Sequence, residues 1–308
     1  MVNVEQREPR SITSLCSLLG YSRQGLYKAQ HSHQQQCFEE ELLVQQVHKI
    51  RVHQPRIGGR RLHYMLQSFM QEHQFSIGRD SFFEVLLRNG LLVRRRKRKK
   101  PVTTDSFHRY KKYKNLIKEL IPLASNQLWV SDITYIHLNN GFGYLSLITD
   151  AYSRKIVGFY LSKTLAASGS IQALKMALQN NTNIKNLIHH SDRGVQYCCN
   201  DYVCILKNKK IKISMTENGD PLENAIAERV NGILKDELLE EVYTNFASAQ
   251  EGVAKAISVY NYLRPHSSIS YKTPIELHSN NEPVERKWKN YYAKRGLQKV
   301  EVADEICR

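Results

Sequence analysis

The sequence predicts two different parts: a basic all-α region up to about residue 93, and an α/β domain with a mixed sheet after residue 124. Apolar residues recur at helical spacing throughout the first part. In the second part, three successive stretches alternate apolar and polar residues with the period of two that marks β-strands. Helical and strand patterns then follow in turn, which is typical of an α/β domain.

The composition favours a nucleic-acid partner. The chain has 308 residues, 41% of them hydrophobic, which is enough for more than one domain. Lysine and arginine number 45 against 29 aspartate and glutamate residues, so the formal charge is +16 and the pI is near 9.5. Such a charge predicts a polyanionic partner, DNA in preference to an anionic membrane surface.

Other features favour a cytoplasmic protein. The chain has no run of about 18 apolar residues and no signal-peptide segment at its start. Its six cysteines show no C-x-x-C pair and no disulfide framework, as expected in a reducing compartment.

Residues 11–30 fit two short helices around a glycine turn. Gly20 suits a helix C-cap, and Ser22 suits the N-cap of the next helix. The second helix presents three polar side chains outward: Arg23, Gln24 and Lys28. We therefore expect residues 1–35 to form a helix-turn-helix segment that binds DNA. A plain helical hairpin is the alternative.

Residues 36–93 predict a second helical unit. One helix contains Leu42 to Ile50, Pro55 and Gly58 break it, a second helix runs through Leu62 to Phe69, and a third runs from about Gly78 to Arg88. Three cations lie at the break: Arg56, Arg60 and Arg61. We expect this unit to be a second DNA-binding domain.

Residues 94–124 form a basic linker. Its first seven residues are all cations: Arg94, Arg95, Arg96, Lys97, Arg98, Lys99 and Lys100. Like charges at this density do not fold on one another, so we expect this run to lie along DNA phosphates. A solvated charge run is the alternative.

Residues 125–278 are predicted to form the α/β domain, in the element order of a ribonuclease H fold. An antiparallel meander has strands at 128–136, 142–149 and 155–161, with the Asn139-Asn140-Gly141 turn between the first two. A helix at 168–179, a strand at 186–190, a helix from Asn200 to Leu206, a strand at 211–215 and a helix from about Pro221 come next. A final helix, 248–263, has a Ser248-x-x-Glu251 capping box, and Thr273 caps a short helix; residues 279–308 are a charged tail without an assigned function.

Asp132 interrupts the apolar face of the first strand. Leu128, Val130, Thr134 and Ile136 share its face. Burying an unpaired carboxylate there would cost on the order of several kcal/mol of desolvation free energy, so a metal ion is a natural counterpart.

Two further acids complete a candidate site. Asp192 follows the end of a short strand, and Glu228 lies on a helix whose apolar stripe faces elsewhere. At 100° per residue, Glu228 and Lys235 are about 20° apart on that helix, with Asn224 on the same face. Three hard carboxylates suit a pair of Mg²⁺ or Mn²⁺ ions for two-metal phosphoryl transfer. Taken singly, each acid also fits a structural role: a buried hydrogen-bonded Asp, a turn Asp and a solvated helix Glu.

Three blocks built around these acids carry a family resemblance. Trp129-x-x-Asp132-Ile-Thr-Tyr, His190-Ser-Asp192-Arg-Gly-x-Gln-Tyr197 and Glu223-Asn-Ala-x-x-Glu228-Arg-x-x-Gly-x-Leu-Lys235-x-Glu237 resemble the signature blocks of DDE transposases of the insertion-sequence three family. Thirty-five residues separate Asp192 from Glu228, as the DD(35)E name of that group requires. The block Tyr260-Asn-x-x-Arg264-Pro-His266 and the segment LCSLLGYSRQGLYK resemble further parts of the second-reading-frame product.

The resemblance implies a ribonuclease H-like (integrase) catalytic core with N-terminal all-α helix-turn-helix modules. It implies metal-dependent cleavage at the transposon ends, and transfer of the 3′-OH into target DNA, by Asp132, Asp192 and Glu228 with two Mg²⁺ or Mn²⁺ ions. Lys235 would bind phosphate, and Asn224 would support Glu228 beside the DNA. The expected partners are the terminal inverted repeats, target DNA, further copies of the chain and an upstream-frame product, in the nucleoid of a bacterial cytoplasm.

Two other functions remain open on the sequence. A DNA-binding regulator with an inactive core would keep the basic modules but lose acids, whereas this chain retains all three and Lys235. A ribonuclease H-like resolvase would cut branched DNA irrespective of end sequence, and the N-terminal modules argue against it.

Overall fold

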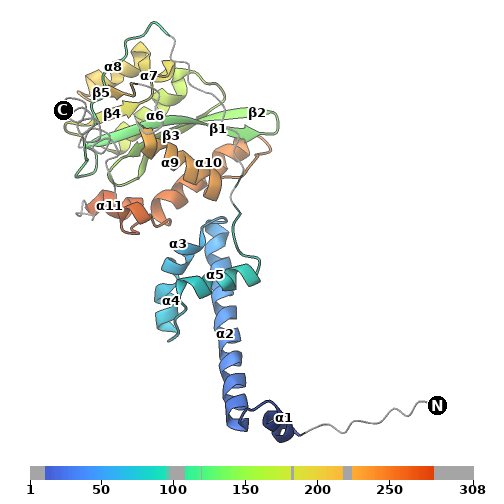
Figure 1. The fold of residues 1–308 in the computed structure, drawn as a ribbon. Helices are drawn as coiled ribbons and strands as arrows, with labels where there is room; N and C mark the ends of the chain where they lie inside the picture. Colours follow the sequence, from blue (N-terminus) through green and yellow to red (C-terminus); the bar gives the residue numbers. More distant parts are fainter. Residues whose placement is uncertain are drawn as a thin grey trace, which may run out of the picture. The chain divides into compact units, whose positions relative to one another are not determined.

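The computed structural model describes residues 11–94, 96, 108–118, 120–181, 184–217 and 224–280 (Figure 1). The chain divides into two compact units, residues 1–94 and 95–308. Within the described helices, none combines the length and the apolar character needed to cross a membrane.

The N-terminal unit is helical, as predicted. Its helices are α1 (Ile12–Leu18), α2 (Arg23–His53), α3 (Gly59–Met65), α4 (Gln67–Glu72) and α5 (Arg79–Arg88). The turn between α1 and α2 follows the sequence: Gly20 has φ +74°, and Ser22 accepts a 3.0 Å hydrogen bond from the Gly25 amide. The third expected helix is also present as α5, which ends at Arg88 with Asn89 as its C-cap, followed by Gly90 with φ +65°.

Two expectations for this unit were wrong. α2 is one helix of 31 residues, so it runs through positions 35 and 36, where we expected separate helices. The intervening stretch contains no glycine or proline, so nothing in the backbone stops the helix. The helix expected through Phe69 pauses for one residue at Leu66, which is buried in the unit's core.

The five strands form the predicted sheet. They are β1 (Leu128–Leu138), β2 (Gly141–Asp150), β3 (Ile156–Ser162), β4 (Ile188–Ser191) and β5 (Lys212–Met215), in the order β3-β2-β1-β4-β5. β1, β2 and β3 form the antiparallel meander, while β4 runs parallel to both β1 and β5. A mixed five-stranded sheet in this order is ribonuclease H-like, which confirms the predicted fold class.

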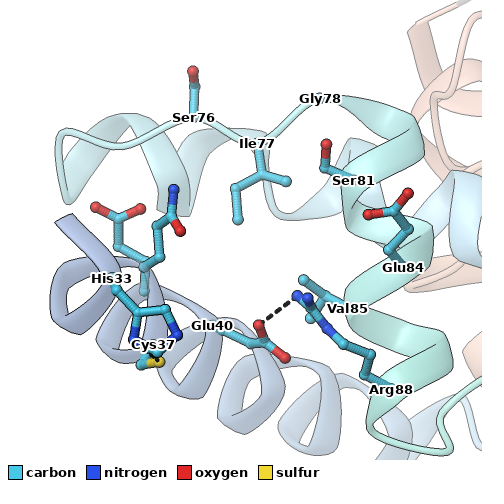
Figure 2. Close-up of a pocket in the computed structure, with 12 residues that line it drawn as sticks. His33, Cys37, Glu40, Ser76, Ile77, Gly78, Ser81, Glu84, Val85 and Arg88 are labelled. Atoms are coloured by element: carbon cyan, nitrogen blue, oxygen red, sulfur yellow. Dashed lines mark hydrogen bonds and ion pairs between the residues drawn. The ribbon is translucent and has the colours of Figure 1, made fainter. Parts of the chain in front are cut away.

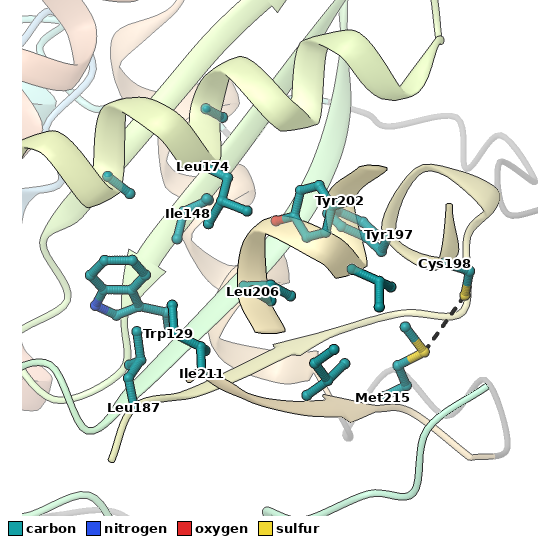
Figure 3. Close-up of a cluster of buried hydrophobic side chains, with 14 of the residues drawn as sticks. Trp129, Ile148, Leu174, Leu187, Tyr197, Cys198, Tyr202, Leu206, Ile211 and Met215 are labelled. Atoms are coloured by element: carbon teal, nitrogen blue, oxygen red, sulfur yellow. Dashed lines mark hydrogen bonds between the residues drawn. The ribbon is translucent and has the colours of Figure 1, made fainter. Parts of the chain in front are cut away.

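Helices pack against both faces of the sheet. They are α6 (Ala167–Asn180), α7 (Val195–Cys198), α8 (Asn200–Asn208), α9 (Ala225–Ile233), the π-helical turn η2 (Leu234–Leu238), α10 (Phe246–Tyr262), the 3₁₀ turn η3 (Ser267–Ile269) and α11 (Pro274–Asn280). α6 packs on the face that carries Trp129 and Ile148, whereas α9 and α10 pack on the face that carries Ile136, Leu145 and Leu147. The core beneath α6 and α8 contains the fully buried side chains of Trp129, Leu174 and Tyr202 (Figure 3).

Two features of the later helices differ from the expectations, and a third expectation stays untested. α9 is described from Ala225, and the helix start expected near Pro221 lies outside the described residues. After Ile233 the helix widens into η2 instead of continuing as an α-helix. α10 begins at Phe246 because Asn245, not Ser248, is its N-cap; the Asn245 side chain accepts from the Ser248 amide at 2.9 Å and the Ser248 hydroxyl accepts from the Asn245 amide at 3.2 Å.

Candidate active site

Asp132 lies in the middle of β1 with both carboxylate oxygens occupied. Oδ1 accepts a 2.9 Å hydrogen bond from the Ile133 amide, and Oδ2 accepts a 2.7 Å hydrogen bond from the side-chain amide of Asn231 on α9. The two bonds come from different elements, so they fix the plane of the carboxylate as well as its position.

Asp192 is brought beside Asp132 by the parallel pairing of β1 and β4. The register pairs Val130 with His190, so Asp132 and Asp192, each two residues further along the chain, lie at the same level, with Asp192 just past the end of β4. Asp192 Oδ1 accepts a 3.0 Å hydrogen bond from the Gly194 amide. A Cβ atom at Gly194 would lie 2.9 Å from Gln196 Oε1 and 3.0 Å from Asp192 Oδ1, so any larger residue here would displace one of these side chains.

One pocket contains both aspartates. Its lining residues are Asp132, Ile133, Tyr135, Leu165, Asp192, Gly194, Gln196 and Tyr197. The side-chain amide of Gln196 donates to the Leu165 carbonyl at 2.9 Å and so ties the turn after β4 to the segment before α6.

Glu228 lies on the first turn of α9, with an exposed side chain and outside the lining of that pocket. α9 is attached to β1 at two points. The buried Asn224 amide donates to the Ser131 carbonyl at 3.0 Å, and Asn231 bonds to Asp132. The helix thus brings Glu228 into the electrostatic neighbourhood of the aspartates.

The charges of the three acids act on one another. Burial, together with the charges of Asp192 and Glu228, raises the pKa of Asp132 to about 7, against the opposing hydrogen bonds from Ile133 and Asn231. In the described part of the chain, no three His, Cys, Asp or Glu side chains stand close enough together to hold a metal ion. Asp132 and Asp192 nevertheless line one pocket, and repulsion between two hard carboxylates is the condition that a divalent cation relieves, so the donor chemistry of this pair suits such an ion.

Lys235 lies in η2, not on the α-helical face that the sequence predicts for it. The angle of about 20° between Glu228 and Lys235 holds only for continuous α-helix. The π-helical turn changes the angular step from Leu234 onward, and π-helical turns occur frequently at functional sites. The carbonyl of Lys235 accepts a hydrogen bond from Arg96, which also donates to the Leu239 carbonyl at 3.1 Å.

Asn231 is a site residue that the sequence-based prediction missed. Its signal was present, because it lies three residues after Glu228 and therefore on the same side of the helix. The prediction considered only the acids, the cations and Asn224 on this helix, and so passed over a second amide that the structure buries.

The predicted DNA-contacting residues of the N-terminal unit lie at the surface to different degrees. Arg23, Gln24, Lys28 and Arg60 are exposed, whereas Arg56 and Arg61 are half-buried. Arg56 donates to the carbonyl of Arg94 at 2.6 Å. Five residues of the cationic run lie outside the described residues: Arg95, Lys97, Arg98, Lys99 and Lys100.

The same unit has an acidic groove between α2 and α5 (Figure 2). Glu39, Glu40 and Glu84 line it, and Arg88 donates to Glu40 at 2.7 Å. Carboxylates repel DNA phosphates, so a DNA-binding surface of this unit would lie away from the groove.

The sequence matches two family models, both described as "Integrase core domain", over residues 122–221 and 209–274. An insertion element IS600 protein of 31 kDa from Shigella sonnei is 35% identical over 267 residues, which cover 84% of this chain and 96% of that protein. Transposase InsF for insertion sequence IS3A from Escherichia coli K12 is 31% identical over 199 residues, 64% of this chain and 69% of that protein.

Among solved structures, the HTLV-2 integrase catalytic core domain in complex with magnesium matches with a TM-score of 0.41 and 21% identity, over 51% of this chain and 98% of that chain. The fold assignment itself rests on the strand order and on the family models. With the integrase core identified and both transposon-encoded relatives aligned along most of their length, the chain belongs to the insertion-sequence three family of transposases.

Proposed function

We propose that this protein cleaves DNA at the ends of its insertion sequence and joins the freed 3′-OH to target DNA, as a DDE transposase of the DD(35)E type. One observation carries the proposal: Asp132 and Asp192 line one pocket, and the charges of both Asp192 and Glu228 raise the pKa of Asp132. Acids that oppose one another's ionisation at the edge of a parallel strand pair are a signature of a functional site.

Cleavage hydrolyses a phosphodiester, whereas joining exchanges one phosphodiester for another. In cleavage, a water oxygen bonds to phosphorus at the element's end, the bond from phosphorus to the 3′ oxygen breaks, and that oxygen takes up the proton that the water loses, which leaves a 3′-OH and a 5′-phosphate. In joining, the oxygen of the 3′-OH bonds to a target phosphorus and gives up its proton, and the target 3′ oxygen leaves and takes up a proton. Two Mg²⁺ or Mn²⁺ ions held by Asp132, Asp192 and Glu228 would supply Lewis-acid stabilisation of the phosphoryl charge.

The chain's own residues orient these acids and the DNA. Asn231 and the Ile133 amide fix the two oxygens of Asp132, and the Gly194 amide fixes Asp192. Asn224 holds the start of α9 against β1 and so positions Glu228. The ammonium group of Lys235 would bind a phosphate next to the reacting bond.

DNA recognition would fall to the basic parts of the chain. Arg23, Gln24 and Lys28, exposed at the start of α2, would read the terminal inverted repeats. Arg60 and the cationic run that begins at Arg94 would contact phosphates and set the salt dependence. We expect the active complex to contain several copies on DNA, with or without an upstream-frame product, at the bacterial nucleoid.

The test compares cleavage of a labelled insertion-sequence end by the wild type and by Asp132→Asn, Asp192→Asn and Glu228→Gln. Each substitution removes a carboxylate that would stabilise the transition state through a bound metal ion, so the cleavage rate should fall by at least about 10³-fold while binding to the end is retained. Chelation of divalent ions should abolish cleavage by the wild type. Asp201→Asn, an exposed acid of the same unit, is the control and should keep full activity.

Two results would contradict the proposal. Metal-dependent nicking that survives Asp192→Asn unchanged would remove this residue from the chemistry. Equal cleavage of branched DNA with and without the element's end sequence would indicate a resolvase instead.

A further inference from the structure

Four aromatic rings lie together on the β1–β2 hairpin. Tyr135 pairs with Tyr144 across the strands, and His137 pairs with Phe142. The ring centroids are 5.1 Å apart in each pair, and Tyr135 and Phe142 are 5.9 Å apart, all in edge-to-face contact. We refer to Tyr135, His137, Phe142 and Tyr144 as the hairpin aromatic cluster.

The cluster is continuous with the candidate active site. Tyr135 lies three residues after Asp132 on β1 and lines the pocket that contains Asp132 and Asp192. From there the rings follow the hairpin toward its turn, and Figure 1 shows this end of β1 and β2 extending past α6. A strand that leaves the pocket in this direction would pass over the rings.

The cluster remains open to solvent. Phe142 is 47% exposed, His137 is exposed, and Tyr135 and Tyr144 are half-buried. Cross-strand aromatic pairs also stabilise hairpins, and that role alone accounts for the half-buried tyrosines. It does not account for a phenylalanine ring left half in water beside Tyr135, because that exposure costs hydrophobic free energy.

The surroundings suit a polyanion with flat apolar groups. No acidic residue occurs from Ile133 through Leu147, so nothing on the hairpin itself repels phosphates. Nucleobases present such flat faces, and they stack on exposed aromatic side chains with little sequence preference. In a duplex those faces are already covered by neighbouring bases, so only unpaired bases can use the cluster.

We propose that the hairpin aromatic cluster binds unpaired nucleobases of the DNA strand that leaves the active pocket. This rests on the proposed function, which places a DNA end in that pocket. It adds a binding site that opens the duplex next to the reacting phosphodiester and holds the freed bases. The site is sequence-tolerant, so it acts together with the N-terminal unit that would read the end.

The test measures binding without turnover. Full-length protein in a chelating buffer is titrated with an insertion-sequence end carrying 2-aminopurine beside the cleavage position, either fully paired or with that flank left unpaired. We expect the wild type to bind the unpaired form more tightly and to quench its fluorescence. Phe142→Leu combined with Tyr144→Leu removes the ring faces but keeps apolar bulk, and should lower affinity for the unpaired form by about 5- to 100-fold.

Controls separate this proposal from folding and from catalysis. Tyr262→Leu, at an exposed tyrosine of α10, should leave both the affinity and the quenching unchanged. Asp192→Asn should keep the quenching although it loses cleavage, so a failed cleavage assay does not decide this test. Equal affinity of the wild type for both DNA forms, or a double variant that folds and still quenches fully, would overturn the proposal.

Discussion

The two units of this chain place their charged and polar groups in opposite ways. Among the described residues of the N-terminal unit, Gln54 is the only buried polar side chain, and the ion pair of Arg88 with Glu40 lies at the surface. The catalytic unit buries Arg264 completely, in a pair with Glu237. The N-terminal unit thus keeps its charges at the surface, where the proposed DNA contacts would need them, whereas residues 95–308 use a buried ion pair to hold two elements together.

The largest expected difference concerns these two ion pairs. Arg264 donates to both oxygens of Glu237, at 2.9 and 3.0 Å, and so joins the end of α10 to η2, the turn that contains Lys235. Arg264→Leu removes a two-pronged ion-pair donor from the mostly buried Glu237 carboxylate, which should cost about 3–5 kcal/mol of unfolding free energy. Arg88→Leu removes an exposed pair and should cost about 0–1 kcal/mol.

Denaturant unfolding measures both effects. Tryptophan emission, to which Trp129 in the core of residues 95–308 contributes, reports Arg264→Leu, and far-UV circular dichroism reports the helices around Arg88. Similar losses for the two variants would show that burial does not distinguish the two pairs. That result would remove the physical basis of the comparison.

The next effect is the pH dependence of stability. Burial lowers the pKa of His278 to about 4, and the nearby charge of Lys155 adds to the effect. Between pH 6.5 and about 4 the unfolded chain takes up a proton that the folded chain does not, so unfolding free energy falls as pH falls through this range. The loss attributable to His278 is about 3 kcal/mol at 1.36 kcal/mol per pKa unit.

Unfolding at pH 7, 6, 5 and 4 checks this for the wild type and His278→Gln. The variant should show a shallower fall, because the proton-linked difference is gone. His48→Gln, on the exposed surface of α2, is the matched control and should leave the slope unchanged. A slope for His278→Gln equal to that of the wild type would show that folding does not lower the pKa of this histidine.

A third difference separates two amide side chains. Asn231→Ala removes the donor that holds Asp132 Oδ2 at 2.7 Å. Because loss of such an orienting bond at other metal sites lowers metal affinity or activity by about 10- to 100-fold, we expect a loss of about that size here. The Mg²⁺ concentration needed for half-maximal cleavage should rise. Gln24→Ala, in the exposed first turn of α2, should instead weaken end binding at unchanged Mg²⁺ dependence. A shift of the Mg²⁺ dependence in both variants would contradict separate roles for the two units.

The fold of the catalytic unit was more predictable than its site. Alternation predicted β1 and its neighbours to within a few residues, because a strand with one buried face shows its period directly in the sequence. Helix ends were less predictable, since the polar stretch within α2 is compatible with either helix or loop when read alone. The π-helical turn at Leu234 and the bond from Asn231 depend on packing of α9 against β1, which local sequence does not report.

The smallest expected difference concerns helix caps. Asn245 caps the N-terminus of α10 through two reciprocal hydrogen bonds with Ser248, whereas Ser22 caps α2 through one, accepted from the Gly25 amide. Asn245→Ala should therefore cost about 1 kcal/mol or slightly more, and Ser22→Ala about 0.5–1 kcal/mol. Asn245→Gly is the sharper variant, since glycine at an N-cap costs only a few tenths of a kcal/mol, roughly, relative to asparagine. Thermal unfolding should show the largest loss for Asn245→Ala, a smaller one for Ser22→Ala and the smallest for Asn245→Gly. If Asn245→Gly lost as much stability as Asn245→Ala, the stabilisation would come from other contacts of the asparagine side chain and not from capping of the exposed helix end.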